Sequence, residues 1–304
     1  MFVFPLLATV ISLIFAGLLL RQYAEKKKPY QLVWSMALVM FGIGALAETL
    51  ATLGSWNEIL VKLYYLFGGT LVVGYLGLGT LYVSGDYDAG SPLATFFLGR
   101  RFNTLISTSL TFFLWLMIYG RDMFRTNSIV ALVVTFLYLA ILLTAIFAKE
   151  KVPSAYLFVI LIGTALAIFA VSQGAIADPS KLAETEGWRA LGRTRGIKTG
   201  AFSLNVIGSF LLIIGAIQSS ISLIRKHIMR QRAVGNILIA AGVLVVAAGG
   251  TLGGLLRLGG QAAISIPMAV GVTIMFFGFL ETGRATPPSQ KPRPVTETSR
   301  ARGR

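Results

Sequence analysis

Acidic side chains inside apolar segments are the residues best placed to do chemistry in this sequence, and Glu48 is the one that lies well inside such a segment. It lies about five residues before the end of the apolar stretch 31–53, which at about 1.5 Å per helical residue puts it roughly 7 Å below a membrane boundary. An ionised carboxylate at that depth is costly unless it is paired or meets water, and intramembrane ionisable groups are enriched at functional sites. Glu48 is therefore the first candidate for a functional site.

Other polar side chains are expected at the same depth, near the ends of neighbouring apolar stretches. Together they predict an outward-facing polar pocket made of Glu48, Lys62, Tyr64, Tyr65, Gln173, Asn205, Thr251 and Arg257. A pair of Glu48 with Arg257 or with Lys62 would compensate the charge. The competing interpretation is structural: the carboxylate reaches the interface or pairs with a neighbour, and no ligand is involved.

Composition argues against most other chemistries. The chain has no cysteine, which removes disulfides, thiolate catalysis and iron–sulfur ligation, and its single histidine, His227, rules out a bis-histidine haem. The glycine-rich stretch 249–254 has no Lys-Ser/Thr end and is not a phosphate loop. We therefore predict no catalytic residue, no cofactor and no metal, and an enzyme is disfavoured.

The elements that must position these groups are membrane-spanning helices. Of the 304 residues 55% are hydrophobic and 13% are charged, whereas a soluble domain carries about 25% charged residues. A spanning helix needs about 20 apolar residues. Nine stretches approach that length: 2–20, 31–53, 63–83, 102–119, 129–148, 155–176, 201–224, 234–256 and 262–280. The sequence predicts an all-α, polytopic transmembrane helical bundle of about nine spans over residues 1–283, or eight if 102–119 does not cross. A disordered, basic cytoplasmic tail is predicted over 284–304.

Two connecting loops carry features of their own. Residues 84–101 contain an apolar run before Arg100 and predict a short helix in the inner interface. In the loop 177–198, Asp178 followed by proline predicts a helix start. We expect Trp188 and Leu191 of that loop to rest on the lipid headgroups.

Charge and small residues indicate orientation and partners. Most basic residues fall on the side that contains 21–28, 225–232 and the tail, so we expect the N-terminus outside and the C-terminus in the cytoplasm. The net charge of +15 then indicates binding to anionic lipid headgroups, with His227 in one of these loops, and not to nucleic acid.

The chain has 33 glycines, many of them inside the spans, and a hydroxyl stripe marks 104–111. Such stripes are typical of helix packing, and they also suit a membrane-protein partner or a homo-oligomer.

Two segments resemble an uncharacterised family of bacterial multi-pass membrane proteins. The first, 48–82, contains Leu-Tyr-Tyr-Leu and Tyr-Leu-Gly-Leu-Gly-Thr-Leu-Tyr, and the second, 187–253, contains Gly-Trp-Arg-Ala-Leu-Gly-Arg. The resemblance implies a place in the bacterial inner membrane, that is, the cell membrane. It implies no activity and transfers no functional residues.

Three classes of function compete. We favour a small-solute transporter or channel that uses the outward-facing polar pocket. The alternative is a non-enzymatic membrane sensor or an accessory subunit of a membrane complex, which would bind a partner through its glycine faces and basic loops. A membrane enzyme ranks last, since it would want two convergent carboxylates and only Glu48 with Glu58 would serve.

Overall fold

The structure, a computed structural model, is a bundle of helices. It describes residues 2–84, 92–126, 128–184, 186–192, 195–225, 230–250 and 260–284. Within these residues there is no strand, and the one extended pairing is an isolated antiparallel bridge between Ile176 and Leu191. Seven helices are long and apolar enough to cross a membrane, and two shorter apolar helices cover Ala131–Phe147 and Val234–Gly249. The predicted fold class, a multi-pass transmembrane helical bundle, is confirmed.

The helices follow the predicted stretches closely. In chain order they are α1 (Val3–Lys26), α2 (Pro29–Leu53), α3 (Glu58–Leu63), η1 (Tyr64–Leu71), α4 (Val72–Val83), α5 (Pro92–Leu98), α6 (Arg100–Trp115), η2 (Leu116–Gly120), α7 (Arg121–Thr126), α8 (Ser128–Phe147), η3 (Lys149–Lys151), α9 (Val152–Ser172), η4 (Pro179–Ala183), η5 (Gly187–Ala190), α10 (Arg195–Arg225), α11 (Arg230–Gly249) and α12 (Ala262–Arg284). The segment Arg100–Gly120, which contains the least secure predicted stretch, is among the seven long apolar helices. The short helix expected before Arg100 is α5.

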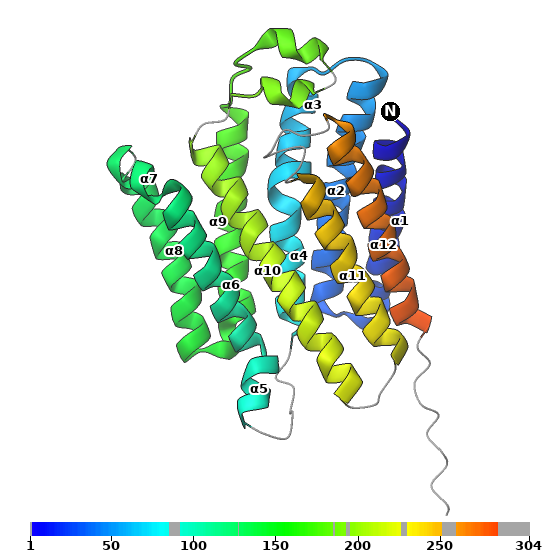
Figure 1. Cartoon of the computed structure of the whole chain (residues 1–304), viewed down its shortest axis with the longest axis vertical. Coiled ribbons are helices and arrows are strands. Elements are labelled where there is room, and N and C mark those ends of the chain that lie inside the picture. Colours follow the sequence, from blue (N-terminus) through cyan, green and yellow to red (C-terminus); the bar gives the residue numbers. More distant parts are fainter. Residues whose placement is uncertain are drawn as a thin grey trace, which may run out of the picture.

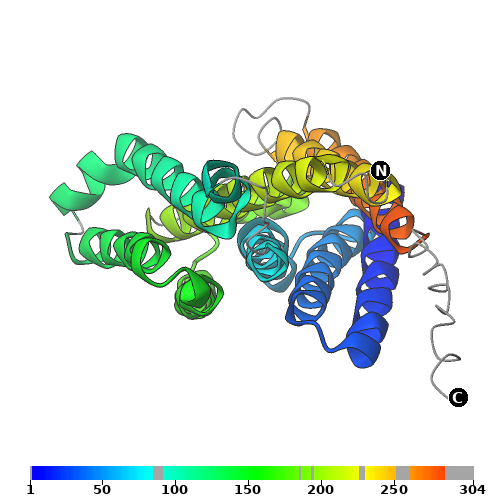
Figure 2. The ribbon, with the colours of Figure 1, turned by 90° about the horizontal axis from the view of Figure 1, so that it is seen from below.

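The bundle has two groups of helices with α4 and α10 between them (Figures 1 and 2). On one side α1, α2, α11 and α12 pack together, and on the other side α6, α8 and α9 do so. Helix α10 contacts α4, α6, α9 and α11, so it joins both groups. Short helices α3, η4 and η5 cover the end of the bundle at which α1 begins (Figure 1).

Paired glycines let the central helices approach closely. A Cβ atom built on Gly77 of α4 would lie 2.8 Å from the Cα of Gly208 on α10, and one on Gly208 would lie 2.2 Å from the carbonyl oxygen of Val73. Helices α11 and α12 meet in the same way, because a Cβ on Gly242 would lie 2.5 Å from the carbonyl oxygen of Gly271. These glycine faces therefore serve contacts within the chain, as small residues do at membrane helix interfaces.

The hydroxyl stripe of α6 is also used for packing. Thr104, Ser107, Thr108 and Thr111 are all buried. Thr111 donates to the carbonyl of Ser107, and Asn103 one turn earlier donates to the carbonyl of Leu211 on α10 at 3.1 Å. The stripe is therefore part of the α6–α10 interface, and three of its hydroxyls bond within α6.

We predict that Gly208→Ala destabilises the protein by about 1–3 kcal/mol, because the added methyl group overlaps the backbone of α4. The measurement is thermal unfolding of the purified chain in detergent. Gly17→Ala in α1 is the matched control, since a Cβ there has nothing within 4 Å. An equal melting temperature for Gly208→Ala and Gly17→Ala would contradict the close α4–α10 contact.

Candidate functional site

Glu48 lies completely buried on α2, with 0% of its surface exposed, and its partners come from the other end of the chain. The side-chain amide of Gln261 donates to Oε1 at 2.5 Å, and the hydroxyl of Ser265 donates to the same oxygen. Gln261 and Ser265 are four residues apart at the start of α12, so they share one helix face. The residue directly before α12 and one in its first turn thus supply two donors to the carboxylate, and the positive end of the helix dipole favours an anion there.

A tryptophan on the loop between α9 and α10 fixes the amide that holds Glu48. The indole Nε1 of Trp188 donates to Oε1 of Gln261 at 2.9 Å, which leaves the amide nitrogen directed at the carboxylate. Trp188 is only 4% exposed, and its ring lies 6.1 Å from that of Tyr64. Tyr64 in turn meets Trp56 edge to face at 5.4 Å. We call Trp56, Tyr64 and Trp188 the aromatic roof of the site.

The second oxygen of the carboxylate is the unusual feature. Among the residues that the structure describes, Glu48 Oε2 is buried and has no hydrogen-bond partner. A buried carboxylate oxygen without a donor is costly. The site is therefore suited to take up a proton or a small cation at this oxygen, since either would remove the uncompensated charge.

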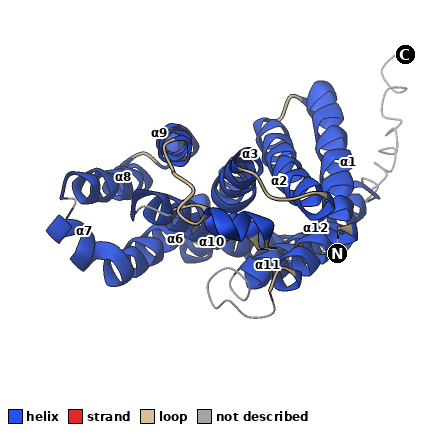
Figure 3. Cartoon of the chain, turned by 90° about the horizontal axis from the view of Figure 1, so that it is seen from above, coloured by secondary structure: helices blue, strands red, loops and turns tan. Residues whose placement is uncertain are grey.

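The loop between α9 and α10 carries the roof residue Trp188 and folds back on the bundle (Figure 3). Its two ends pair as short antiparallel backbone, with the amide of Ala177 donating to Ala190 at 2.8 Å and that of Gly192 to Ala175 at 2.9 Å. The expectation that Trp188 and Leu191 rest on headgroups is wrong. Both are buried, because this pairing turns them inward toward α3 and η1.

The helix start predicted at Asp178 is present, but it is a short 3-10 turn, η4. Asp178 does not cap it by a bond to the backbone of the helix; its carboxylate accepts from the hydroxyl of Ser180 at 2.5 Å. That hydrogen bond, together with Lys181 at 3.3 Å, holds the pKa of the Asp178 carboxyl below its usual range. Asp178 is thus a charged group whose side chain is partly exposed, and its described partners do not include Glu48.

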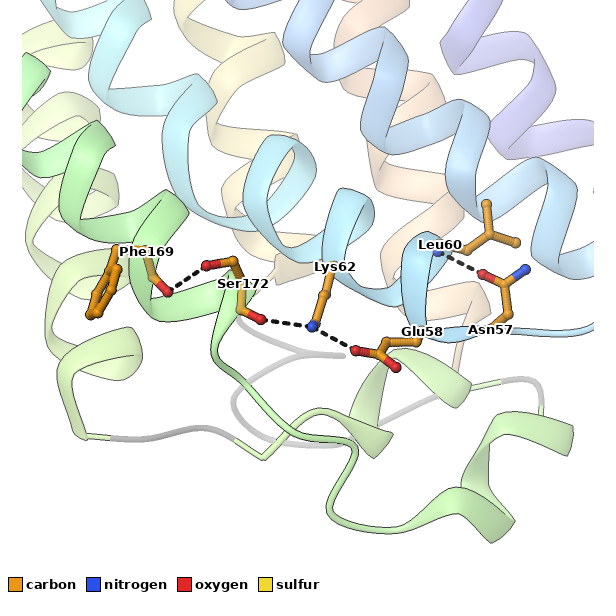
Figure 4. A network of polar contacts seen from close by, with 6 residues as sticks. All are labelled: Asn57, Glu58, Leu60, Lys62, Phe169 and Ser172. Atoms are coloured by element: carbon orange, nitrogen blue, oxygen red, sulfur yellow. Dashed lines mark hydrogen bonds and ion pairs between the residues drawn. The ribbon is translucent and has the colours of Figure 1, made fainter.

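Lys62 lies on the rim of the site and binds other partners than Glu48. Its ammonium donates to Glu58 at 2.6 Å and to the carbonyl oxygen of Ser172, at the end of α9, at 2.8 Å (Figure 4). The predicted pair of Glu48 with Lys62 is not formed in the described structure. The two side chains point to different helices: Lys62 reaches the end of α9, whereas Glu48 reaches the start of α12.

The other predicted pocket residues spread over several elements. Asn205 donates to the carbonyl of Gly69 at 2.7 Å and so supports the π-helix η1, Gln173 is exposed at the end of α9, and Tyr65 is half-buried. Thr251 and Arg257 lie outside the described residues, so the pair of Glu48 with Arg257 stays a prediction. Of the described residues in the predicted pocket, Tyr64 alone joins the surroundings of Glu48, through Trp188.

Sequence reasoning missed Gln261 and Ser265. A signal was present: two polar side chains four residues apart stand at the start of the last predicted span, at the same outer depth as Glu48. The pairing itself joins residues more than 200 positions apart.

Comparison of the chain with family models, with curated proteins and with solved structures found no match. The resemblance to a bacterial multi-pass membrane family therefore stays a prediction.

We predict that Trp188→Ala opens the site to water. The chain has no cysteine, so Ser265→Cys places a single thiol at a position that is 3% exposed. With Trp188 present, a water-soluble maleimide should label this thiol slowly. With Trp188→Ala the rate should rise about tenfold, as expected if local opening becomes easier by about 1.4 kcal/mol.

The control for this labelling is Ser172→Cys, at an exposed position on α9. Its rate should be the same in both backgrounds. Equal rates for Ser265→Cys with and without Trp188 would show that the roof does not close the site.

Proposed function

We propose that the chain is a small-solute transporter in which Glu48 binds a proton or a small cation that is coupled to solute movement. The observation that carries the proposal is the fully buried carboxylate on α2 whose Oε2 has no partner within the described residues. A carboxylate in this position is expensive to keep charged, and such groups mark ion and proton pathways in membrane proteins. The burial favours a state in which the carboxylate is neutralised while the roof is closed.

The surroundings of Glu48 support a site that opens. Two of its three roof residues, Trp188 and Trp56, lie on the loop between α9 and α10 and on the segment before α3, which connect long helices, and the third, Tyr64, begins η1. Directly after α3 the chain forms the π-helix η1, a rare element that is frequent at functional sites. Gly44, one turn before Glu48, faces Gly68 of η1 so closely that a Cβ on Gly44 would lie 2.6 Å from its Cα. A shift of η1 would therefore move α2 near the carboxylate.

We further propose that the roof faces the outside of a bacterial cell, with the protein in the inner membrane, the N-terminus outside and the C-terminus in the cytoplasm. The support is the distribution of Lys and Arg in the sequence. The basic loops on the inner side would then bind anionic headgroups.

We predict that Glu48→Gln abolishes coupled flux and leaves the fold intact. The amide keeps the shape of the side chain and its contact with Ser265, but it neither releases a proton nor attracts a cation. The measurement uses the full chain in proteoliposomes loaded with a pH-sensitive dye, with proton flux followed after imposed proton and Na⁺ gradients.

Glu58→Gln is the matched control, because it removes a carboxylate on the rim that binds only Lys62 among the described ion pairs. This variant should retain the flux. The proposal fails if the unaltered protein carries no flux, or if Glu48→Gln carries the same flux. If Glu48→Gln only lowers the melting temperature and the flux per folded molecule is unchanged, Glu48 has a packing role and the proposal is wrong.

A sensor or accessory subunit is the second candidate, and one observation favours it. The described polar residues predicted for the pocket are dispersed: Lys62 faces the end of α9, and Asn205 binds the backbone of η1. A sensor needs no polar path across the membrane. Maleimide labelling of single cysteines placed along α2 and α12 separates the two classes, since a transporter should show reactive positions at both membrane faces.

A further inference from the structure

A cavity lies between helices that take no part in the Glu48 site. It is bounded by α8, α9 and α10, with Thr70 of η1 at one side, and its volume is about 440 Å³. This is within the range of about 300–1,000 Å³ that is usual for ligand pockets. Its walls are mostly aliphatic side chains, and no charged residue lines it.

Four hydroxyl groups interrupt the apolar wall; those of Tyr138 and Ser203 lie close enough to interact with each other, and none of the four has a partner elsewhere in the described structure. They belong to Tyr138, Tyr156, Thr199 and Ser203. The first three residues are only 5%, 1% and 2% exposed. In a bilayer no water is at hand to satisfy such groups, so buried hydroxyls normally bond back to the chain.

Neighbouring hydroxyls show the normal arrangement. Thr164, also on α9, donates to the carbonyl of Ile160 at 2.7 Å, and its oxygen lies 3.1 Å from the hydroxyl of Tyr75. Thr144 on α8 likewise donates to the carbonyl of Ala140. Thr135 on α8 and Ser220 and Ser222 on α10 also lack a partner in the described structure, but they do not line the cavity. The four hydroxyls at the cavity differ from them in the open space beside them, which points to a ligand that accepts hydrogen bonds there.

The depth of the hydroxyls restricts the ligand. Leu204, next to Ser203, packs on Gly163, where a Cβ would lie 3.4 Å from its side chain, and Gly163 is in the middle of α9. Tyr138 is likewise in the middle of α8 and lies close to Ser203. Polar lipid headgroups do not reach the middle of a spanning helix. The ligand is therefore one that dissolves in the hydrocarbon region.

The cavity also has a side that is reached from lipid. Ile129 and Phe169, which line it, are 78% and 66% exposed on helices whose outer faces are apolar. A molecule in the bilayer would enter between α8 and α9 without crossing a polar surface.

We propose that this cavity binds a membrane-dissolved carbonyl compound of the quinone class. Hydroxyls supply donors to carbonyl oxygens, and their placement on three helices suits a ring with more than one oxygen. The apolar walls accept the ring faces and the start of an alkyl tail. An acyl chain alone would leave the four hydroxyls unpaired, and the volume is too small for a whole diacyl phospholipid. This proposal is independent of the role of Glu48.

The test is binding of decylubiquinone to the purified full chain in lipid nanodiscs. Trp115 lies 6.4 Å from the ring of Tyr138, so a quinone in the cavity should quench tryptophan fluorescence in a saturable way. The double variant Tyr138→Phe with Ser203→Ala should bind about tenfold more weakly, since it removes two donors with little change of volume. Because these two hydroxyls have no partner in the described structure other than each other, and the double variant removes both, the melting temperature should not fall.

Tyr75→Phe is the matched control. Tyr75 is a buried residue of α4 whose hydroxyl contacts Thr164 of α9, and it does not line the cavity. Its affinity for decylubiquinone should equal that of the unaltered chain. Decylbenzene, which has the tail and a ring but no carbonyl, should compete at least about tenfold less well. Ala201→Trp, which fills the cavity from α10, should abolish the saturable quenching.

Three results would overturn the proposal. The first is equal affinity of the double variant and the Tyr75→Phe control. The second is equal competition by decylbenzene, which would assign the cavity to alkyl chains. The third is a co-purified phospholipid, seen by native mass spectrometry, that decylubiquinone does not displace.

Discussion

Polar groups inside the bilayer must find their partners within the chain, and this constraint accounts for the arrangement around Glu48. Oε1 of the carboxylate accepts from two donors at the N-terminal end of α12, Gln261 just before the helix and Ser265 in its first turn, and Gln261 is oriented by Trp188. Helix α2, helix α12 and the loop between α9 and α10 are thereby connected through the carboxylate of Glu48. A change at any of the three would alter the other two, so the carboxylate is the point at which movement of the loop would be felt in the bundle.

Close packing makes these long-range partners available. A side chain on α2 reaches α12 only because the helices around it approach through small residues, as at Gly44 with Gly68 and at Gly242 with Gly271. Lipid provides no hydrophobic force that would hold more distant helices together. The buried polar contacts therefore depend on the glycines of the spans. Replacing one of these glycines by a larger residue would disturb the helix packing and the polar contacts together.

The sequence predicted the helices well and the site only in part. Long apolar runs and flanking charges define spanning helices locally, which is why even Arg100–Gly120, rich in Ser and Thr, was placed correctly. Depth along a span was also readable, and it singled out Glu48. The sequence did not reveal which helices are neighbours, so Lys62 was assigned to the wrong partner and Gln261 was not found. Trp188 turns inward because Ala177 pairs with Ala190 across the loop. The general preference of tryptophan for lipid headgroups gives no information about this pairing.

Hydrogen bonding together with adjacent open space separates packing from binding in this protein. The stripe of α6 and the wall of the cavity both carry Ser and Thr hydroxyls, and a sequence pattern does not distinguish them. In α6 the hydroxyls of Thr104, Ser107 and Thr111 bond within the helix, which stabilises the interface with α10 and needs no ligand. The fourth hydroxyl of the stripe, that of Thr108, has no partner in the described structure, but its side chain is fully buried by packing and does not line the cavity. At the cavity the hydroxyl of Tyr156 has no partner within the described residues, and that of Tyr138 lies close only to Ser203, beside the open space of the cavity. A chain under selection only for packing would gain stability by replacing these tyrosines with phenylalanine, so their hydroxyls are best explained by a bound acceptor.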